Sequence, residues 1–363
     1  MINQRQSIIQ EDLSIVPSGT WIKDLSGEDP ISRLTILPII TNPNAWVNSA
    51  HPDEAITKIE LVDSSQVIFS MDAAAARGLA YVGTGHFPVT SLNYSALQWA
   101  MCPIEIYFGR DLWDPEYALD PAWFKNLQLR ITHDLDAYMA GATVGYLNVY
   151  ADVFNKGAVS PKGYLLAQDT WDKTCVSAAK EYIDLPTDFP VRLVMLKNLS
   201  DTQAPEYQVD RVKLTVAHDK TIIFNILMER YQQLMQSLLP PYTEKVSGRM
   251  AATDVYFWMT AAFEPTIVFA GTSDSDGVLQ MSAATGGQKR KCEASAVTEF
   301  EAIARGHSPN GCVPLFLGDK NNPSDAIDFK SEGGGQVELT FATNASIDTN
   351  DTYHIITQQY RSA

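Results

Sequence analysis

The sequence is poor in charged residues, and the basic ones are scarcer than the acidic ones. Charged residues fill 19% of the 363 positions, and 27 Lys and Arg stand against 43 Asp and Glu, for a formal net charge of −16. A protein that grips nucleic acid needs clustered Lys and Arg to neutralise phosphates. The short basic run Lys289-Arg290-Lys291 spans only three residues, and we interpret it as a solvated loop. Direct nucleic-acid binding is therefore not expected.

Cysteine and histidine are too few and too scattered to predict a metal centre. The four cysteines form no CxxC pair, and no two of the six histidines lie within thirty residues of each other. We expect free thiols, as in a protein made in a reducing cytoplasm. Cys102 and Cys312 each lie just before a Pro-containing apolar run, and both are predicted to be buried. No metal and no cofactor are predicted.

Recognisable catalytic motifs are also missing. The sequence has no GxSxG elbow, no HExxH helix and no P-loop. Acidic pairs such as Asp111/Asp114 and Asp274/Asp276 could bind a cation or act as acid and base. They lie in loops rich in Gly, Ser and Pro, where Asp is a common turn former. We therefore predict no catalytic residue and no enzyme activity, although a site assembled from distant residues is invisible at this level.

Targeting and membrane-spanning signals are absent from the sequence as well. The first residues, MINQRQSIIQEDLSIV, lack the apolar core and the cleavage site of a signal peptide. No uncharged stretch is apolar enough to predict a transmembrane helix.

What the sequence does contain is an internal repeat. Four features occur in the same order in both halves: an opening alternating strand, a strand pair with a helical segment, a Pro–apolar–Gly–acid motif leading into an alternating strand, and a closing strand. The two copies span 31–40 and 189–199, 56–82 and 209–238, 103–134 and 314–344, and 146–154 and 353–361. Phe69 and Phe224 are 155 positions apart, but Gly109 and Gly318 are 209 apart. An insertion of about 50 residues in the second copy explains the difference.

The repeat predicts an all-β chain of two tandem eight-stranded jelly-roll β-sandwiches with short helices in loops, because each copy has many short strands separated by turn residues. We expect an N-terminal arm over 1–18, a first jelly roll over 19–155, an interdomain connection over 156–188, and a second jelly roll over 189–363. The insertion, at about 242–311, should project from one end of the second sandwich as a tower or contact loop. The apolar spacing from Ile226 to Leu239 predicts a clearer helix in the second copy than in the first.

The paired motifs PIEIYFGRD and VPLFLGD, with the strands NLQLRIT and QVELTFA that follow them, resemble the double jelly-roll major capsid proteins. This family coats tailless icosahedral viruses, among them adenoviruses and lipid-containing bacteriophages. The resemblance covers residues 19–361 and rests on architecture, since none of these motifs carries a catalytic residue.

The resemblance implies a structural protein of the virion that is synthesised in the host cytoplasm. It implies homotrimers in which three chains present six similar jelly rolls, so that a pseudo-hexameric tile packs against neighbouring capsomers. Penton and minor capsid proteins would be further partners. The arm would lie on the inner face, where Ile2, Ile8 and Ile9 could touch a neighbour or an internal membrane; the alternative is a frayed terminus.

Two other classes of protein remain open at the level of sequence. The first is a glycan-active hydrolase built from two jelly rolls, similar to peptide-glycan amidases, which would normally carry a secretion signal and disulfides. The second is a lectin-like carbohydrate-binding protein, whose site would be an aromatic and acidic loop such as Trp113–Tyr117. We interpret Trp113 and Trp123 as core or trimer-contact residues instead.

Overall fold

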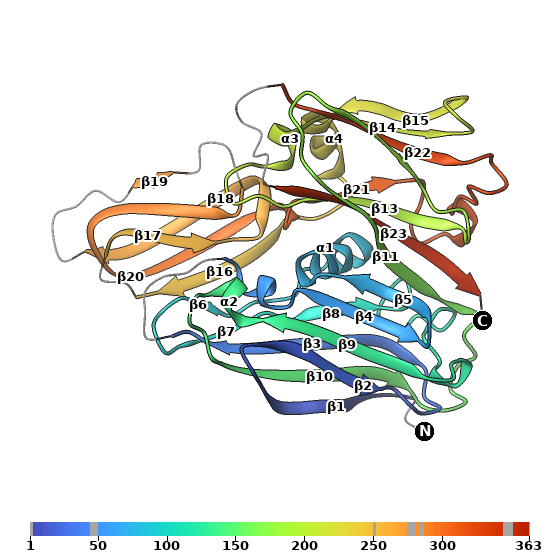
Figure 1. Ribbon diagram of the computed structural model, residues 1–363, viewed down its shortest axis with the longest axis horizontal. Helices are drawn as coiled ribbons and strands as arrows, with labels where there is room; N and C mark the ends of the chain where they lie inside the picture. The colour runs from blue at the N-terminus through green and yellow to red at the C-terminus, as the bar shows by residue number, and fades with distance from the viewer. Residues whose placement is uncertain are drawn as a thin grey trace.

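The computed structural model describes residues 3–43, 50–249, 252–273, 280–282, 287–343 and 351–362, with side chains left undescribed in several insertion strands. Short strands dominate and helices are short, which confirms the predicted all-β class. Figure 1 shows two β-sandwiches, one blue to green and one green to red, with a third sheet projecting from one side.

The first sandwich consists of two layers that face each other, one of five strands and one of four. One layer has the strand order β1-β10-β3-β8, with β7 also paired to β3, and the other has the order β2-β9-β4-β5. Alternating strands such as β3 bury every second side chain between the layers. The bounds are β1 Gln4–Ile15, β2 Ser18–Asp24, β3 Ile31–Thr41, β4 Lys58–Asp63, β5 Gln66–Met71, β6 Leu92–Asn93, β7 Trp99–Met101, β8 Ile104–Tyr107, β9 Leu127–Asp134 and β10 Val144–Phe154.

The second sandwich repeats this arrangement. Its layers have the strand orders β11-β23-β13-β21 and β12-β22-β14-β15, so every strand has a counterpart in the first sandwich. The predicted eight-stranded jelly roll is therefore confirmed in both copies. The bounds are β11 Gly163–Thr174, β12 Lys180–Asp184, β13 Val191–Asn198, β14 Val209–Val216, β15 Thr221–Leu227, β21 Cys312–Phe316, β22 Gly335–Phe341 and β23 Thr352–Ser362.

The two sandwiches share one continuous sheet. Strand β5 pairs in parallel with β11 through Phe69 and Ala167, and this joins four strands of each copy into an eight-stranded sheet. One core cluster fills the first sandwich and extends into the insertion, and a second cluster fills the second sandwich. The two jelly rolls thus lie side by side. The chain itself and the hydrogen bonds between β5 and β11 join them into one body.

The strand pairing moves the predicted domain boundaries. Residues 4–15, predicted to lie in a free arm, form β1 and pair along β10 at the edge of the first jelly roll. Residues 163–174 and 180–184, predicted to lie in an interdomain connection, form β11 and β12, the first two strands of the second jelly roll. Each copy therefore begins one hairpin earlier in the sequence than its most regular alternating strand suggests.

Short helices connect the strands, and the longest lies in the first copy. Helix α1 has twelve residues, whereas its counterpart α4 has eight, so the prediction of a clearer helix in the second copy was wrong. An Ala-rich helix that is buried all round shows no apolar stripe, which explains the error. The bounds are η1 Pro52–Ala55, α1 Ala73–Thr84, η2 Pro121–Trp123, α2 Leu135–Tyr138, α3 Pro205–Gln208, α4 Met228–Met235 and η3 Pro323–Asp325.

The insertion, called the tower from here on, forms a further sheet together with one short strand of the first copy. It lies between α4 and β21 and is organised around the 21-residue strand β20. Strand β6, from the corresponding loop of the first copy, pairs in parallel with β16 at the base of this sheet. Figure 1 shows the tower in orange at the left. The bounds are β16 Tyr242–Gly248, β17 Ala252–Trp258, β18 Ala261–Ser273, β19 Gln280–Ser282 and β20 Lys289–Pro309.

The Pro–Gly–acid motif has the same geometry in both copies. The backbone N–H that follows Gly109 donates to Asp114, and the backbone N–H that follows Gly318 donates to Asp325. Further along each loop, Leu119 pairs with Ile31 and Ile327 pairs with Val191. The repeated acids therefore fold their own loops against the opening strand of each sandwich.

Candidate functional site

Helix α1 lies where the two sandwiches and the tower meet, and its sequence suits that position. Every residue from Ala73 to Gly83 is buried, and the small side chains let β8 and β21 pack closely against the helix. The Asp72 side chain caps the N-terminus by accepting from the N–H of Ala75 at 2.7 Å, and its other oxygen contacts the buried ammonium of Lys197. Gly85 ends the helix with a left-handed φ of 79°.

A fully buried ion cluster joins this helix to the base of the tower. Arg77 Nη1 lies 2.7 Å from Asp53 Oδ2, His51 Nδ1 lies 2.7 Å from Asp53 Oδ1, and His51 Nε2 lies 3.2 Å from Glu244 Oε1. All four side chains have no exposed area. Asn310, which directly follows β20 at the C-terminal end of the insertion, donates to Asp53 at 2.9 Å. The cluster thus ties η1, α1 and both ends of the insertion together.

The charges in this cluster compensate one another. Burial lowers the pKa of His51, but Asp53 and Glu244 outweigh burial and raise its pKa to about 9. Burial would raise the pKa values of Asp53 and Glu244, but His51 and Arg77 hold both below their ordinary values. Two cations and two anions therefore balance at neutral pH, which is the condition for keeping charges out of water.

One trio in this cluster has the residue types of a metal site. His51, Asp53 and Cys102 place one potential ligand atom each within 4.8 Å of one another. However, the Arg77 guanidinium already neutralises Asp53, and burial raises the pKa of Cys102, which keeps it as a thiol. A metal ion would have to displace a bound cation, so the arrangement fits an ion cluster better than a metal centre. Sequence spacing missed this cluster because its members lie up to 193 positions apart.

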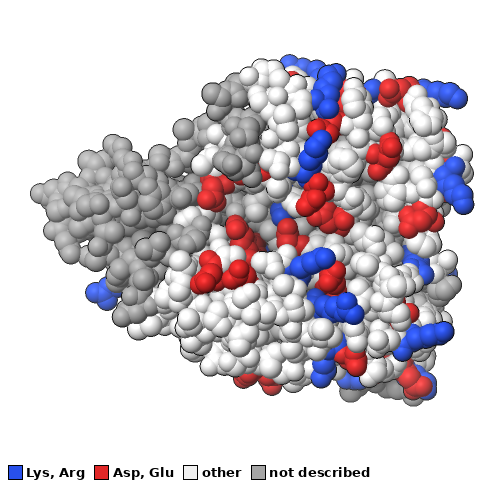
Figure 2. Space-filling model, in the orientation of Figure 1, with Lys and Arg blue, Asp and Glu red and all other residues white. Residues whose placement is uncertain are grey.

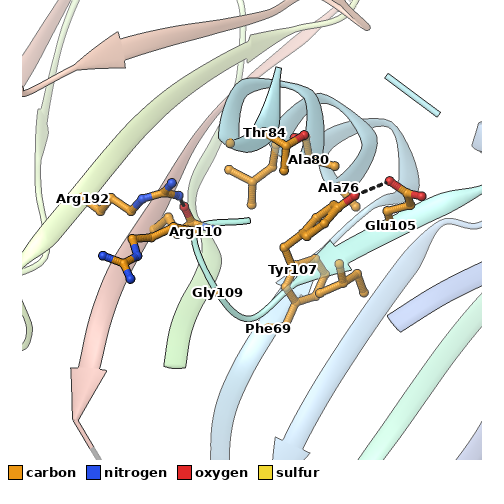
Figure 3. A pocket seen from close by; sticks show the side chains of 13 residues that line it. Phe69, Ala76, Ala80, Thr84, Glu105, Tyr107, Gly109, Arg110 and Arg192 are labelled. Carbon is orange, nitrogen blue, oxygen red and sulfur yellow. Dashed lines mark hydrogen bonds between the residues drawn. The ribbon is translucent and has the colours of Figure 1, made fainter. Parts of the chain in front are cut away.

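A small pocket lies near the opposite end of α1, between the two jelly rolls. Its accessible volume is about 20 Å³, and Figure 3 shows the side chains that line it. Arg192 and Arg110 lie on one side, while Tyr107 and Glu105 lie on the other and are joined by a 2.8 Å hydrogen bond. A cavity of this size has room for about one water-sized group and is far smaller than an ordinary substrate site.

The acidic and aromatic residues singled out in the sequence are packed into the fold. Asp114 is buried and forms a forked ion pair with Arg110, at 2.6 and 2.9 Å, rather than facing solvent, whereas Asp111 is exposed. Trp113 packs edge-on against Phe154, and Tyr117 packs against Tyr360 and under Arg110. This loop therefore presents no free aromatic platform for a sugar. Asp274 and Asp276 lie outside the described residues.

The three isoleucines predicted as inner-face contacts have different positions. Ile2 lies outside the described residues. Ile8, on β1, is 60% exposed, and Ile9 packs against the core of the first sandwich. Ile8 thus remains available for a contact beyond the chain.

The cysteine side chains predicted to be buried lie inside the fold. Cys102 and Cys312 are buried free thiols, as expected, and Cys175 is also buried. The side chains of Lys289, Arg290 and Lys291 are outside the described set. Among the described residues, no helix combines the length and the apolar character that crossing a bilayer requires.

No protein-family model matches the chain, and no curated protein sequence is similar to it. Solved structures, in contrast, match over nearly its full length. The STIV MCP superposes with a TM-score of 0.59 at 10% identity, covering 98% of this chain and 96% of the other. PBCV-1 VP54 has a TM-score of 0.58 at 11% identity, with coverage of 99% and 94%. The major capsid protein P2 from bacteriophage PM2 has a TM-score of 0.57 at 7% identity, with coverage of 99% and 98%.

These likenesses extend over both jelly rolls, so they concern the tandem arrangement rather than one sandwich alone. The strand order of each half and the full-length superposition agree with the resemblance seen in the sequence. The chain has the double jelly-roll fold found in viral major capsid proteins.

Proposed function

We propose that this chain is a structural protein, a major capsid protein located in the shell of a virion. The observation that carries the proposal is the full-length match: tandem jelly rolls that superpose on major capsid proteins over more than nine-tenths of each chain. A shell protein needs a rigid body rather than a reactive site. The ion cluster and the tight pocket suit that need, because both fix elements in place.

The proposed assembly is a homotrimer. Two equivalent jelly rolls lie side by side in each chain, so three chains around one axis present six similar sandwiches. Such a pseudo-hexameric tile packs against neighbouring tiles in an icosahedral shell. The tower, which projects from the second sandwich, would form the outer face or the contact between subunits.

A position in the shell of a virion implies further partners. Penton and minor capsid proteins would fill the places that hexagonal tiles leave. Ile8, exposed on the edge strand β1, would contact a neighbour or an internal membrane. Figure 2 shows Lys and Arg scattered among Asp and Glu on the drawn face, with acidic side chains gathered near its middle. This face is not suited to gripping a genome.

The two alternatives lose their support at the residue level. For a lectin, the loop Trp113–Tyr117 would have to expose its rings, but Trp113 and Tyr117 pack on aromatic neighbours of the same chain. For a glycan hydrolase, a pair of accessible carboxylates would have to flank a cleft. Asp114, the best candidate in that loop, is buried in an ion pair with Arg110.

The test is the size and shape of the purified full chain. Light scattering should give a stable particle of three times 40.1 kDa, and negative-stain images should show hexagonal plates or closed shells. A monomer that hydrolyses or binds glycans would overturn the proposal.

A further inference from the structure

Arg192 is a buried cation whose direct partners are all neutral. The residue is 3% exposed. Its Nε donates to the carbonyl of Lys320 at 2.5 Å, Nη1 donates to the side-chain oxygen of Gln358, and Nη2 donates to Asn321 Oδ1 at 3.4 Å. These contacts satisfy hydrogen bonds but supply no negative charge. A buried charge normally has an oppositely charged partner, because the loss of hydration is otherwise uncompensated.

A second cation lies close to Arg192. Lys320 is partly buried, and its ammonium donates to the carbonyl of Val82 at 2.5 Å. Among the described residues, no carboxylate oxygen lies within 4.0 Å of Arg192 or Lys320. Arg110 is close by, but Asp114 and Glu116 already neutralise it. Asp111 and Asp319 act on these two cations only from beyond 4.0 Å, so neither cation has a carboxylate in direct contact.

The pKa directions of Arg192 and Lys320 agree with a site that lacks a directly bound anion. Burial lowers the pKa of Arg192 and Arg110 adds to the effect, while Tyr360 and Asp111 oppose it. Burial and the neighbouring Arg192 lower the pKa of Lys320 to about 8, against the opposing charges of Asp111 and Asp319. The carbonyls at the C-terminus of α1 offer only the partial negative charge of a helix end. That partial charge does not replace a full anion.

The pocket described above lies beside Arg192. It is lined by Arg192, Arg110, Gln358, Gly83 and Thr84 on one side and by Glu105, which is paired with Arg33 at 2.6 Å, on the other. Its volume of about 20 Å³ accommodates one small group. Figure 3 shows the guanidinium groups of Arg192 and Arg110 on the same side of the pocket, with Thr84 of α1 nearby. A halide ion is close in size to a water molecule, whereas an organic acid is too large for this volume.

We infer that this pocket binds a small inorganic anion of halide size, held by Arg192 and facing Arg110 and Thr84. Arg192 has N–H groups beyond the three that its neighbours accept, so it can donate to an anion without losing its present contacts. The anion joins the end of α1, in the first jelly roll, to β13 and β23 of the second. It acts as a counter-ion between the two halves of the chain.

The experiment uses the purified full chain in sodium gluconate, because the gluconate anion is too bulky for the pocket. Sodium bromide replaces gluconate stepwise at constant ionic strength while the thermal unfolding midpoint is recorded. Bromide should raise the midpoint in a saturable way, because a ligand that binds only the folded state stabilises it. Crystals grown with bromide should show an anomalous peak in contact with the Arg192 guanidinium.

Two variants separate loss of the site from loss of the fold. Gly83→Ala places a methyl group in the pocket, 3.9 Å from Arg192 Nη1, without a clash, and alanine is the better helix former. Arg192→Gln removes the charge. Both variants should weaken bromide binding by about tenfold or more. This is the change in affinity expected from the loss of one charge-assisted contact. Arg211→Gln, an exposed arginine that bonds Asn225, should keep the full response.

Several results would overturn the inference. Equal midpoints in bromide and gluconate would do so, as would a bromide response that survives both Gly83→Ala and Arg192→Gln. A bromide peak at Arg192 with no shift of the midpoint would identify an adventitious ion only.

Discussion

His51, Asp53, Arg77 and Glu244 carry four charges in a place with no access to water. Such clusters contribute little net stability, because desolvation offsets most of their attraction, but removing one member leaves a buried charge unpaired. The cluster therefore fixes which elements can meet. Only one approach of the tower to α1 places Glu244 against His51 and Arg77 at once.

The charge of His51 makes the stability of the chain depend on pH. Its pKa is about 9 in the folded chain and near 6.5 when unfolded, so protonated His51 stabilises the fold. That contribution is complete below pH 6.5 and is lost as pH rises through about 9. It amounts to about 3 kcal/mol. The free energy of unfolding, measured by urea titration between pH 6 and 9.5, should fall over this window.

The variant His51→Gln should reduce that slope, because it has no proton to lose, while Glu54, whose pKa burial raises to about 8, still contributes to it. His133→Gln is the matched control, since His133 is also buried but faces the carbonyl of Val16. An unchanged slope in His51→Gln would show that other groups cause the pH dependence. The groups facing His51 that need separate comparison are Asp53, Glu54, Arg77, Tyr94, Cys102, Tyr138, Tyr242 and Glu244.

For single residues, the sequence predicts which side chains are buried better than it predicts which side chains contact one another. The apolar context of Cys102 and Cys312 correctly indicated buried thiols. Arg77, a single charge in the run AAAARGLAYV, was the available signal for a buried ion pair. Its partners Asp53 and Glu244 lie 24 and 167 positions away, and nothing local links them. Contacts of this kind are set by the tertiary fold and have no period in the sequence.

At the scale of elements, the loop after β8 and the loop after β21 are the parts of the repeat that are most alike in the two copies. Each needs a glycine where its aspartate folds back. A Cβ on Gly109 would lie 2.7 Å from the Cβ of Asp114 and 2.5 Å from the carbonyl of Tyr117, and a Cβ on Gly318 would lie 2.9 Å from the Cβ of Asp325. Glycine is required there by close approach rather than by backbone conformation.

Gly109→Ala and Gly318→Ala should each destabilise the chain, because the added methyl forces the loop away from its aspartate. We expect a loss of about 1–3 kcal/mol in the free energy of unfolding for each. Gly19→Ala is the control, because its nearest neighbour would be Val16 at an ordinary 3.4 Å, and it should change stability by less than about 0.5 kcal/mol. Urea denaturation measures all three. A tolerated Gly109→Ala would mean that the loop is free to shift.

Regular inner strands were predictable, and edge strands were not. Strands such as β9 and β22 alternate strictly because one face is buried and the other is not. In contrast, β1 is mostly exposed and its pairing with β10 is interrupted by two register shifts, so its sequence looks like a polar arm. The end of β11 is exposed and β12 is short. Edge strands bury less, and their pattern is correspondingly weaker.

At the scale of the whole molecule, five of the exposed apolar side chains lie on two equivalent segments, the one after α1 and the tower after α4. Val89, Leu97 and Trp99, in the loop after α1, are 85%, 60% and 61% exposed. In the tower, Val268 and Ile303 lie directly opposite each other on neighbouring strands and are 64% and 41% exposed. The two segments are in contact, since β6 pairs with β16. Exposed apolar groups on segments in contact mark a surface for another protein.

If the chain forms the proposed trimer, this surface is the contact between subunits. The double variant Val268→Ser, Ile303→Ser should then weaken the trimer, because each truncated side chain loses about 1–2 kcal/mol of buried apolar contact. The three copies together lose about 6–12 kcal/mol per trimer. Because the midpoint concentration of a trimer varies as the square root of its dissociation constant, the variant should dissociate at roughly 100- to 10,000-fold higher protein concentration. Light scattering over a dilution series measures the change.

Ile222→Ser is the matched control, because Ile222 is 53% exposed on β15, an edge strand of the second sandwich outside the tower. The control should remain trimeric at every dilution. A double variant as stable as the parent trimer would assign the contact to another surface while leaving the trimer itself intact. A parent chain that stays monomeric at all concentrations would instead remove the capsid proposal. The two failures are therefore distinguishable in one measurement, because the parent protein reports on the assembly and the tower variant reports on where its subunits meet.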